Sequence, residues 1–117
     1  LERVDDVDGV RLVVARTSAT SPEGMREMGD YLKDKLSSVA VVLAAVVDGN
    51  PLLVAMVSAD LVEKGLHAGN LARDTAKVMG GGGGGRPDMA QAGGRQPEKL
   101  DEALRGVADL VRKGLAN

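Results

Sequence analysis

The sequence has no cysteine, phenylalanine or tryptophan, and among its 117 residues it has one histidine and one tyrosine. The absence of cysteine excludes disulfides and thiolate metal sites, and it is consistent with a reducing compartment such as the cytoplasm. One histidine, His67, is too few for an ordinary zinc site. Because Tyr31 is the only aromatic ring, recognition of nucleic-acid bases by stacking is not expected to dominate.

Long hydrophobic runs are absent as well. The longest, Val39 to Val47, has nine residues, whereas a membrane-spanning helix needs about 20. The N-terminus does not resemble a signal peptide, so we expect a cytoplasmic protein with no membrane partner. The chain begins with Leu1 rather than Met, and we therefore expect a piece of a longer protein. At 44% hydrophobic residues, it is long enough for one domain, 1–117, with an aliphatic core.

Glycine, in contrast, is abundant, and six glycines stand in a row from Gly80 to Gly85. Each costs roughly 0.5–1 kcal/mol relative to alanine when it is ordered. The run lies in a basic segment: Lys64 to Arg95 has five basic and two acidic side chains, although the whole chain has a net charge of −2. We interpret the run as an ordered or ligand-ordered loop, because the single helix predicted after it is too short to form a second domain. A flexible linker is the alternative.

Hydrophobic periodicity predicts an α/β (α+β) fold, with a mixed sheet of about five strands packed against about three helices. Turn-forming residues favour hairpins at Asp8-Gly9 and at 48–51. The apolar run 39–47 does not alternate, which is typical of a central strand covered on both faces. Strands are predicted over 1–7, 10–16, 39–47 and 52–58; helices over 22–37 with Ser21 as its cap, over 68–79 after a short helical turn at 61–66, and from Pro97 onward.

The glycine-rich loop, 80–94, is the strongest candidate for a binding site. Successive N–H groups of such a loop can turn toward one anion, which suits phosphate. A P-loop is disfavoured because Arg86-Pro87 stands where Lys and Ser or Thr are needed, and a dinucleotide fingerprint is disfavoured because the run follows a predicted helix. No cysteine nucleophile or HExxH motif is present, and His67 is expected to cap or pack. We therefore predict a binding module without catalysis in this fragment.

The stretch HAGNLARDTAKVMGGGGGGRPDMAQAGG, residues 67–94, resembles the signature of the DHH-associated domain in the form found at the C-terminus of alanyl-tRNA synthetases. The part after the glycines, RPDMAQAGG, is the most specific. In the related domains of DHH-type phosphodiesterases and exonucleases the glycine run leads into a histidine, and here Arg86-Pro87-Asp88 stands in its place. The resemblance covers essentially the whole chain.

This resemblance implies a domain that grips the elbow of tRNA(Ala) and helps to bring aminoacylation and editing domains onto the same tRNA. No cofactor is expected in the fragment, whereas the parent is expected to use ATP, Mg and Zn in other domains, and a homodimer of the parent is compatible with the resemblance. Basic side chains would neutralise phosphates and the glycines would approach the RNA backbone closely. Gln91 would either bond to RNA or tie the loop to the sheet, and Met89 is expected in the core. The predicted RNA-binding residues are Arg73, Lys77, Gly80, Gly81, Gly82, Gly83, Gly84, Gly85, Arg86, Asp88 and Gln91.

Two other functions stay open at this point. The chain could be the substrate-holding domain of a DHH-family phosphodiesterase or exonuclease, which would bind nucleotides or short oligonucleotides; the missing histidine argues against it. It could also be a dimerisation module that pairs through a strand edge at Leu52 to Ser58.

Overall fold

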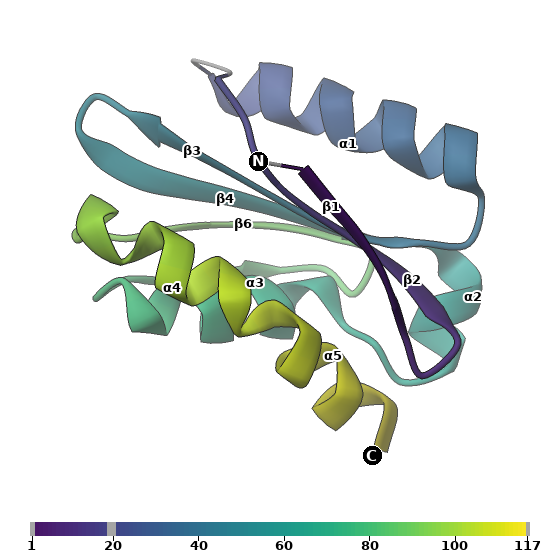
Figure 1. Ribbon diagram of the computed structural model, residues 1–117. Helices are drawn as coiled ribbons and strands as arrows, with labels where there is room; N and C mark the ends of the chain where they lie inside the picture. Colours follow the sequence, from purple (N-terminus) through teal and green to yellow (C-terminus); the bar gives the residue numbers. More distant parts are fainter. Residues whose placement is uncertain (1, 19–20, 117) are drawn as a thin grey trace.

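A computed structural model of the chain describes residues 2–18 and 21–116. Leu1, which the sequence assigned to the first strand, lies outside the described residues. Six strands form one mixed sheet in the order β1-β2-β3-β4-β6-β5 (Figure 1). The mixed sheet with helices is confirmed, and it has one strand more than predicted. The strands are β1 (Glu2–Val7), β2 (Val10–Arg16), β3 (Ala40–Val47), β4 (Asn50–Val57), β5 (Gly82–Gly85) and β6 (Met89–Gly93).

Two tight hairpins organise the first four strands, as the turn residues predicted. Asp8 and Gly9 have φ of 53° and 85°, and Asp48 and Gly49 have φ of 53° and 83°. Positive φ at both central residues is the mark of a type I′ turn, which suits the twist of the strands it joins. These turns make β1–β2 and β3–β4 antiparallel, whereas β2 and β3 run parallel. The parallel pair requires a crossover, and a helix supplies it.

Helix α1 (Pro22–Leu36) is that crossover, and it lies against one face of the sheet (Figure 1). The Ser21 hydroxyl oxygen accepts a hydrogen bond from the Gly24 amide at 3.1 Å, which confirms the predicted cap. The helix ends at Leu36, and the next residue, Ser37, has a φ of 64°. Met25 is fully buried, and Leu32 and Leu36 pack against the same apolar cluster as Val41, Leu43 and Val54 of the sheet.

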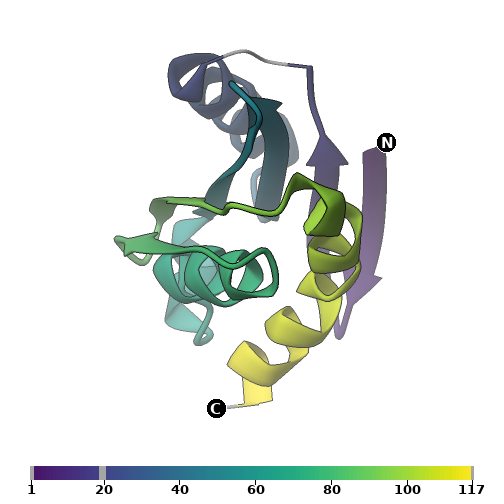
Figure 2. The same ribbon diagram turned by 90° about the vertical axis from the view of Figure 1, so that its left-hand side faces the viewer.

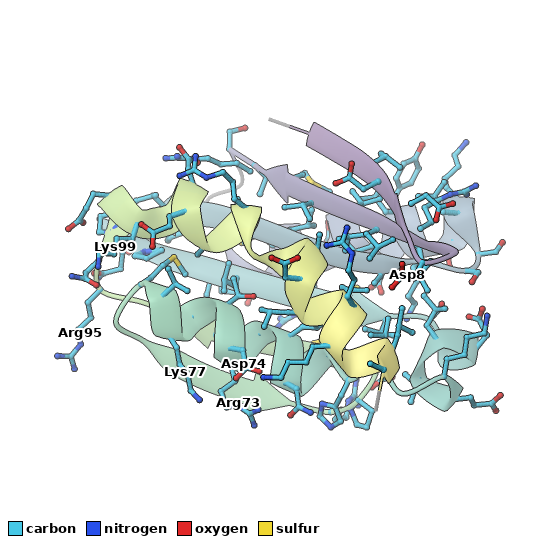
Figure 3. The ribbon with its side chains drawn as sticks, turned by 60° about the horizontal axis from the view of Figure 1, so that its bottom comes forward. Asp8, Arg73, Asp74, Lys77, Arg95 and Lys99 are labelled. Carbon is cyan, nitrogen blue, oxygen red and sulfur yellow. The ribbon has the colours of Figure 1, made fainter. Side chains whose placement is uncertain are left out.

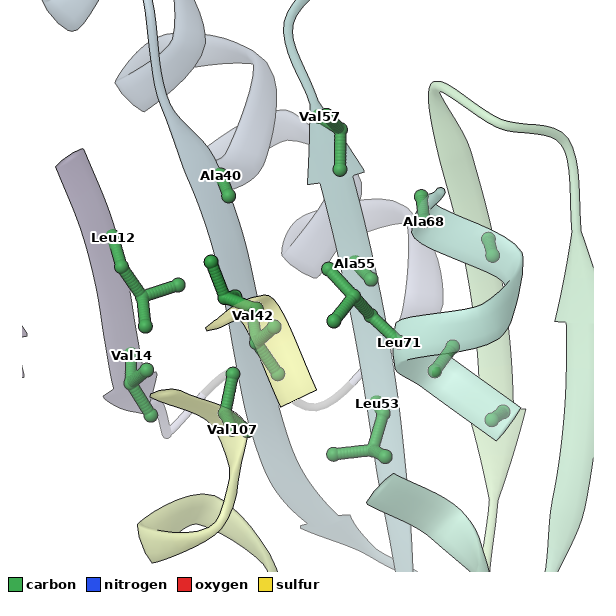
Figure 4. Packing of buried hydrophobic residues seen from close by; sticks show 14 of the residues in the cluster. Leu12, Val14, Ala40, Val42, Leu53, Ala55, Val57, Ala68, Leu71 and Val107 are labelled. Atoms are coloured by element: carbon green, nitrogen blue, oxygen red, sulfur yellow. The ribbon is translucent and has the colours of Figure 1, made fainter. Parts of the chain in front are cut away.

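The other face of the sheet is covered by a second helical layer. It consists of α2 (Ala59–Glu63), α3 (Ala68–Val78) and the C-terminal helices. Figure 4 shows Val42, Leu53 and Ala55 of the sheet facing Leu71 of α3 and Val107 of the C-terminal segment. Because β3 contributes to both clusters, the prediction of a central strand covered on both faces is confirmed.

Two predictions of local structure are wrong. The C-terminal helix is not continuous: a 3₁₀ turn η1 (Pro97–Lys99) leads into α4 (Leu100–Arg105), and Gly106 separates α4 from α5 (Val107–Ala116). The strand predicted at Leu52 to Ser58 cannot offer a free edge, because β4 is paired with β3 on one side and with β6 on the other.

Among the helices of residues 2–18 and 21–116, none is both long and apolar enough to cross a membrane.

Candidate nucleic-acid interface

The glycine run forms the edge strand β5 rather than the predicted loop. It is ordered by antiparallel pairing with β6, in the register Gly82↔Gly93 to Gly85↔Ala90. The amides of Gly80 and Gly81, which precede the strand, bond to the carbonyls of Lys77 and Ala76 at the end of α3. Because successive N–H groups of a strand point in opposite directions, Gly82–Gly85 cannot form the anion nest expected from the sequence.

Alternate glycines of the run are required by close packing of the backbone. A Cβ atom at Gly81 would lie 1.9 Å from the Gly93 oxygen, at Gly83 2.6 Å from the Ala92 Cα, and at Gly85 2.9 Å from the Ala90 Cα. Carbon atoms do not approach backbone atoms so closely without displacement. Gly81, Gly83 and Gly85 are therefore explained by the fold alone.

The remaining two glycines of the strand have no such explanation. A Cβ atom at Gly82 or Gly84 would have no atom within 4 Å. Their cross-strand partners are Gly93 and Gln91, and residues directly opposite in a pair share one face of a sheet. We call this surface, made of Gly82, Gly84, Gln91 and Gly93, the bare face. Ala90 and Ala92 belong to the core on the α3 side, so the bare face lies on the α1 side of the hairpin (Figure 2).

The turn between β5 and β6 is fastened to the beginning of α3. The amides of Ala68 and Gly69 donate to the carbonyls of Pro87 and Arg86 at 2.8 and 3.2 Å. His67 Nδ1 accepts from the Asn70 amide at 3.1 Å, which confirms the predicted capping role. With these amides paired, the α3 N-terminus is not an open anion site.

The predicted cations Arg73 and Lys77 lie on the outer surface of α3 (Figure 3). Both contact Asp74, at 3.2 and 3.6 Å. At the turn, Arg86 Nε lies 3.3 Å from an Asp88 carboxylate oxygen. Exposed ion pairs of this kind contribute only about 0–1 kcal/mol, so each cation can exchange its carboxylate for a phosphate at small cost. Arg73 and Lys77 belong to the layer on the opposite side of the hairpin from the bare face.

Gln91 connects the hairpin to α1. Its side-chain oxygen accepts a hydrogen bond from the guanidinium of Arg26, whose other terminal nitrogen lies 3.8 Å from Glu23. Gln91 was expected either to bond to RNA or to tie the loop to the sheet; in the structure it belongs to the sheet itself and its side chain ties β6 to α1. Met89 packs against the core on the α1 side, as predicted, but its side chain is only half-buried.

The DHHA1 domain model matches residues 9–113. The chain belongs to the DHHA1 domain family. It is 53% identical over 115 residues to the alanine-tRNA ligase of Bacillus subtilis, covering 98% of this chain and 13% of that protein. It is 47% identical over 111 residues to the alanine-tRNA ligase of Chloroflexus aurantiacus, covering 95% of this chain and 12% of that protein.

Two solved structures share this fold. The C-Ala domain from Aquifex aeolicus alanyl-tRNA synthetase is 29% identical and superposes with a TM-score of 0.84, covering 93% of this chain and 97% of that one. A DHH-domain protein, described as a member of a family of ribosomal proteins, is 16% identical, with a TM-score of 0.69. It covers 96% of this chain and 28% of that one, and it shares the fold.

In this DHHA1 domain the structure brings together only part of the predicted site. Gly82, Gly84 and Gln91 share the bare face, whereas Arg73 and Lys77 are on the α3 side. Arg26 was missed, because it lies 65 residues from its partner Gln91 and no local pattern marks it. Within residues 2–18 and 21–116, no group of three or more His, Asp or Glu side chains could hold a metal ion.

Proposed function

We propose that this DHHA1 domain is the tRNA-binding C-terminal domain of an alanyl-tRNA synthetase. It binds the elbow of tRNA(Ala) and helps to bring the aminoacylation and editing domains of the parent chain onto the same tRNA. The fragment itself carries no catalysis or cofactor. The parent, a cytoplasmic ligase that is able to form a homodimer, uses ATP, Mg and Zn in its other domains.

The bare face is the observation that carries this proposal. Two glycines on it are not demanded by any neighbour within 4 Å, and each carries the conformational cost of glycine. A ligand that must approach the backbone closely explains them, and the sugar-phosphate chain of RNA is such a ligand. The similarity to a C-Ala domain over 93% of this chain supports tRNA as the RNA in question.

The arrangement favours recognition of shape over recognition of base sequence. Backbone amides and carbonyls can contact ribose and phosphate, and exposed cations can pair with phosphates, but neither reads a base edge. Tyr31 is the only side chain of the Phe, Tyr or Trp type in the sequence. The tRNA elbow, where two loops meet, is a shape that tRNAs of different identity share. We therefore expect the isolated domain to bind several folded tRNAs with similar affinity.

The experiment is a fluorescence-anisotropy titration of the 117-residue chain. The probes are a tRNA(Ala) transcript, a tRNA of another identity, and a tRNA(Ala) acceptor-stem hairpin that lacks the elbow. Both tRNAs should bind, with affinity falling as salt rises by a log–log slope of about −0.7 to −0.9 per phosphate contacted, and the hairpin should bind poorly. No binding of either tRNA at low salt, or equal binding of the hairpin, contradicts the proposal.

A further inference from the structure

None of the three cations that the sequence analysis predicted to bind RNA lies on the bare face. Arg73 and Lys77 are on α3, whose buried residues pack with Ala90 and Ala92 on the opposite face of the hairpin. Arg86 is at the turn, beyond the last glycine of β5. RNA lying on Gly82 and Gly84 needs a positive charge on the same side, because phosphate contacts supply most of the affinity of such complexes.

Arg26 meets this requirement. Its guanidinium bonds to the side chain of Gln91, and Gln91 lies directly across from Gly84. Cross-strand partners have Cα atoms about 4.5–5.5 Å apart, so the residue that the guanidinium contacts is the direct neighbour of the open position at Gly84. Helix α1 packs against β3 and β4 on this side of the sheet, and its Arg26 side chain reaches the bare face through Gln91.

The present partners of Arg26 hold it in place but compete weakly with phosphate. Gln91 offers a neutral oxygen, and Glu23 is 3.8 Å away with 71% of its side chain exposed. A phosphate accepts two parallel N–H bonds from a guanidinium, and such charge-assisted pairs are about twice as strong as neutral ones. Arg26 is 35% exposed, so an anion can reach it without rearrangement of α1.

We propose that Arg26 binds a backbone phosphate of RNA lying on the bare face, and that Gln91 positions the guanidinium for this contact. This inference rests on the proposed function. On binding, the terminal nitrogen that now faces Glu23 turns to phosphate oxygens, while the other keeps its bond to the Gln91 oxygen, and the Gln91 side-chain NH2 group can donate to a ribose hydroxyl. The RNA-contacting surface therefore extends from the glycine strand to α1, rather than to α3.

The test compares Arg26→Ala with Arg112→Ala in the tRNA(Ala) titration. Arg112 is a matched control: it also forms an i,i+3 pair, with Asp109 at 2.7 Å, but on α5 in the opposite layer. Arg26→Ala should weaken binding about tenfold at low salt and reduce the steepness of the salt slope by about one. Arg112→Ala changes the net charge equally and should leave both nearly unchanged.

Arg26→Lys separates a phosphate contact from a purely structural role. It keeps the charge but loses the bidentate fork, so it should restore the salt slope and recover affinity in part. If the wild type binds and Arg26→Ala binds equally well, or if the alanine and lysine variants lose affinity alike with an unchanged salt slope, the inference is wrong and the proposed function stands. If the wild-type domain binds no tRNA, the proposed function itself fails.

Discussion

Substitutions at two adjacent glycines, Gly82→Val and Gly83→Ala, should have opposite consequences for folding and binding. At Gly83 an added Cβ would lie 2.6 Å from the Ala92 Cα and 2.7 Å from both the Ala92 Cβ and the Gln91 oxygen, and φ is +152°. Backbone atoms cannot yield as a flexible side chain would. Overpacking and an unfavourable φ together should cost about 2–4 kcal/mol, which lowers the melting temperature of a domain of this size by roughly 10–20 °C.

At Gly82, in contrast, an added Cβ atom would have no other atom within 4 Å. Surface substitutions at such positions change stability by no more than about 0.5 kcal/mol, and valine is favoured in strands. Gly82→Val should therefore melt within about 3 °C of wild type. Its two methyl groups would nevertheless stand on the bare face and hold RNA away from the backbone, so tRNA affinity should fall about tenfold or more, which corresponds to about 1.4 kcal/mol or more.

Thermal melts followed by circular dichroism and tRNA titrations of both variants test this reasoning. Gly84→Ala serves as a second open position on the same face, and it should behave like Gly82→Val with a smaller loss of affinity. If Gly82→Val unfolds the domain, Gly82 and Gly84 are required by the fold and not by a ligand. If it folds and binds tRNA like wild type, the bare face is not the interface.

Two further predictions concern stability. Asp60 Oδ2 and Oδ1 accept hydrogen bonds from Ser38 and Ser58 at 2.5 and 2.6 Å, and these bonds lower the pKa of Asp60 in the folded state. Its stabilisation is therefore complete above the unfolded-state pKa and lost as pH falls through the folded-state pKa. Asp60→Asn should lower the urea midpoint near neutral pH and match wild type at strongly acidic pH; a difference independent of pH would contradict this. The fully buried hydroxyl of Thr75 finds no hydrogen-bond partner within residues 2–18 and 21–116, so Thr75→Val should stabilise the domain by about 1 kcal/mol, whereas Thr75→Ser, which keeps the hydroxyl, should not.

The scaffold was predictable because its signals are local. Asp8-Gly9 and Asp48-Gly49 specify their hairpins through residues that tolerate positive φ, and Ser21-Pro22 specifies the start of α1. The β-branched run of β3 required burial on both faces, and both clusters contain it. In each case the deciding chemistry lies within a few residues of the element that it determines.

The candidate site was less predictable because its determinants are distant or lack side chains. Glycine is depleted in strands, so β5 could not be recognised from Gly82–Gly85, and it forms because β6 pairs with it along its length. Along β5, glycines that face open space alternate with glycines that lie against the backbone of β6, and the pairing register decides which are which. The contact between Arg26 and Gln91 depends on where α1 packs, which no short sequence pattern encodes. The break at Gly106 was missed because the apolar spacing continues through it.

The fastening of α3 to the glycine hairpin also affects how the molecule avoids unwanted assembly. An edge strand without side chains would be an ideal template for adding a strand from another chain, since neither charge nor bulk would repel the newcomer. Here the carbonyls of Ala76 and Arg86 and the amides of Gly69 and Gly81 join α3 to both ends of β5. These bonds occupy both ends of the edge strand, so a strand from another chain could pair only with the four residues between them, Gly82–Gly85.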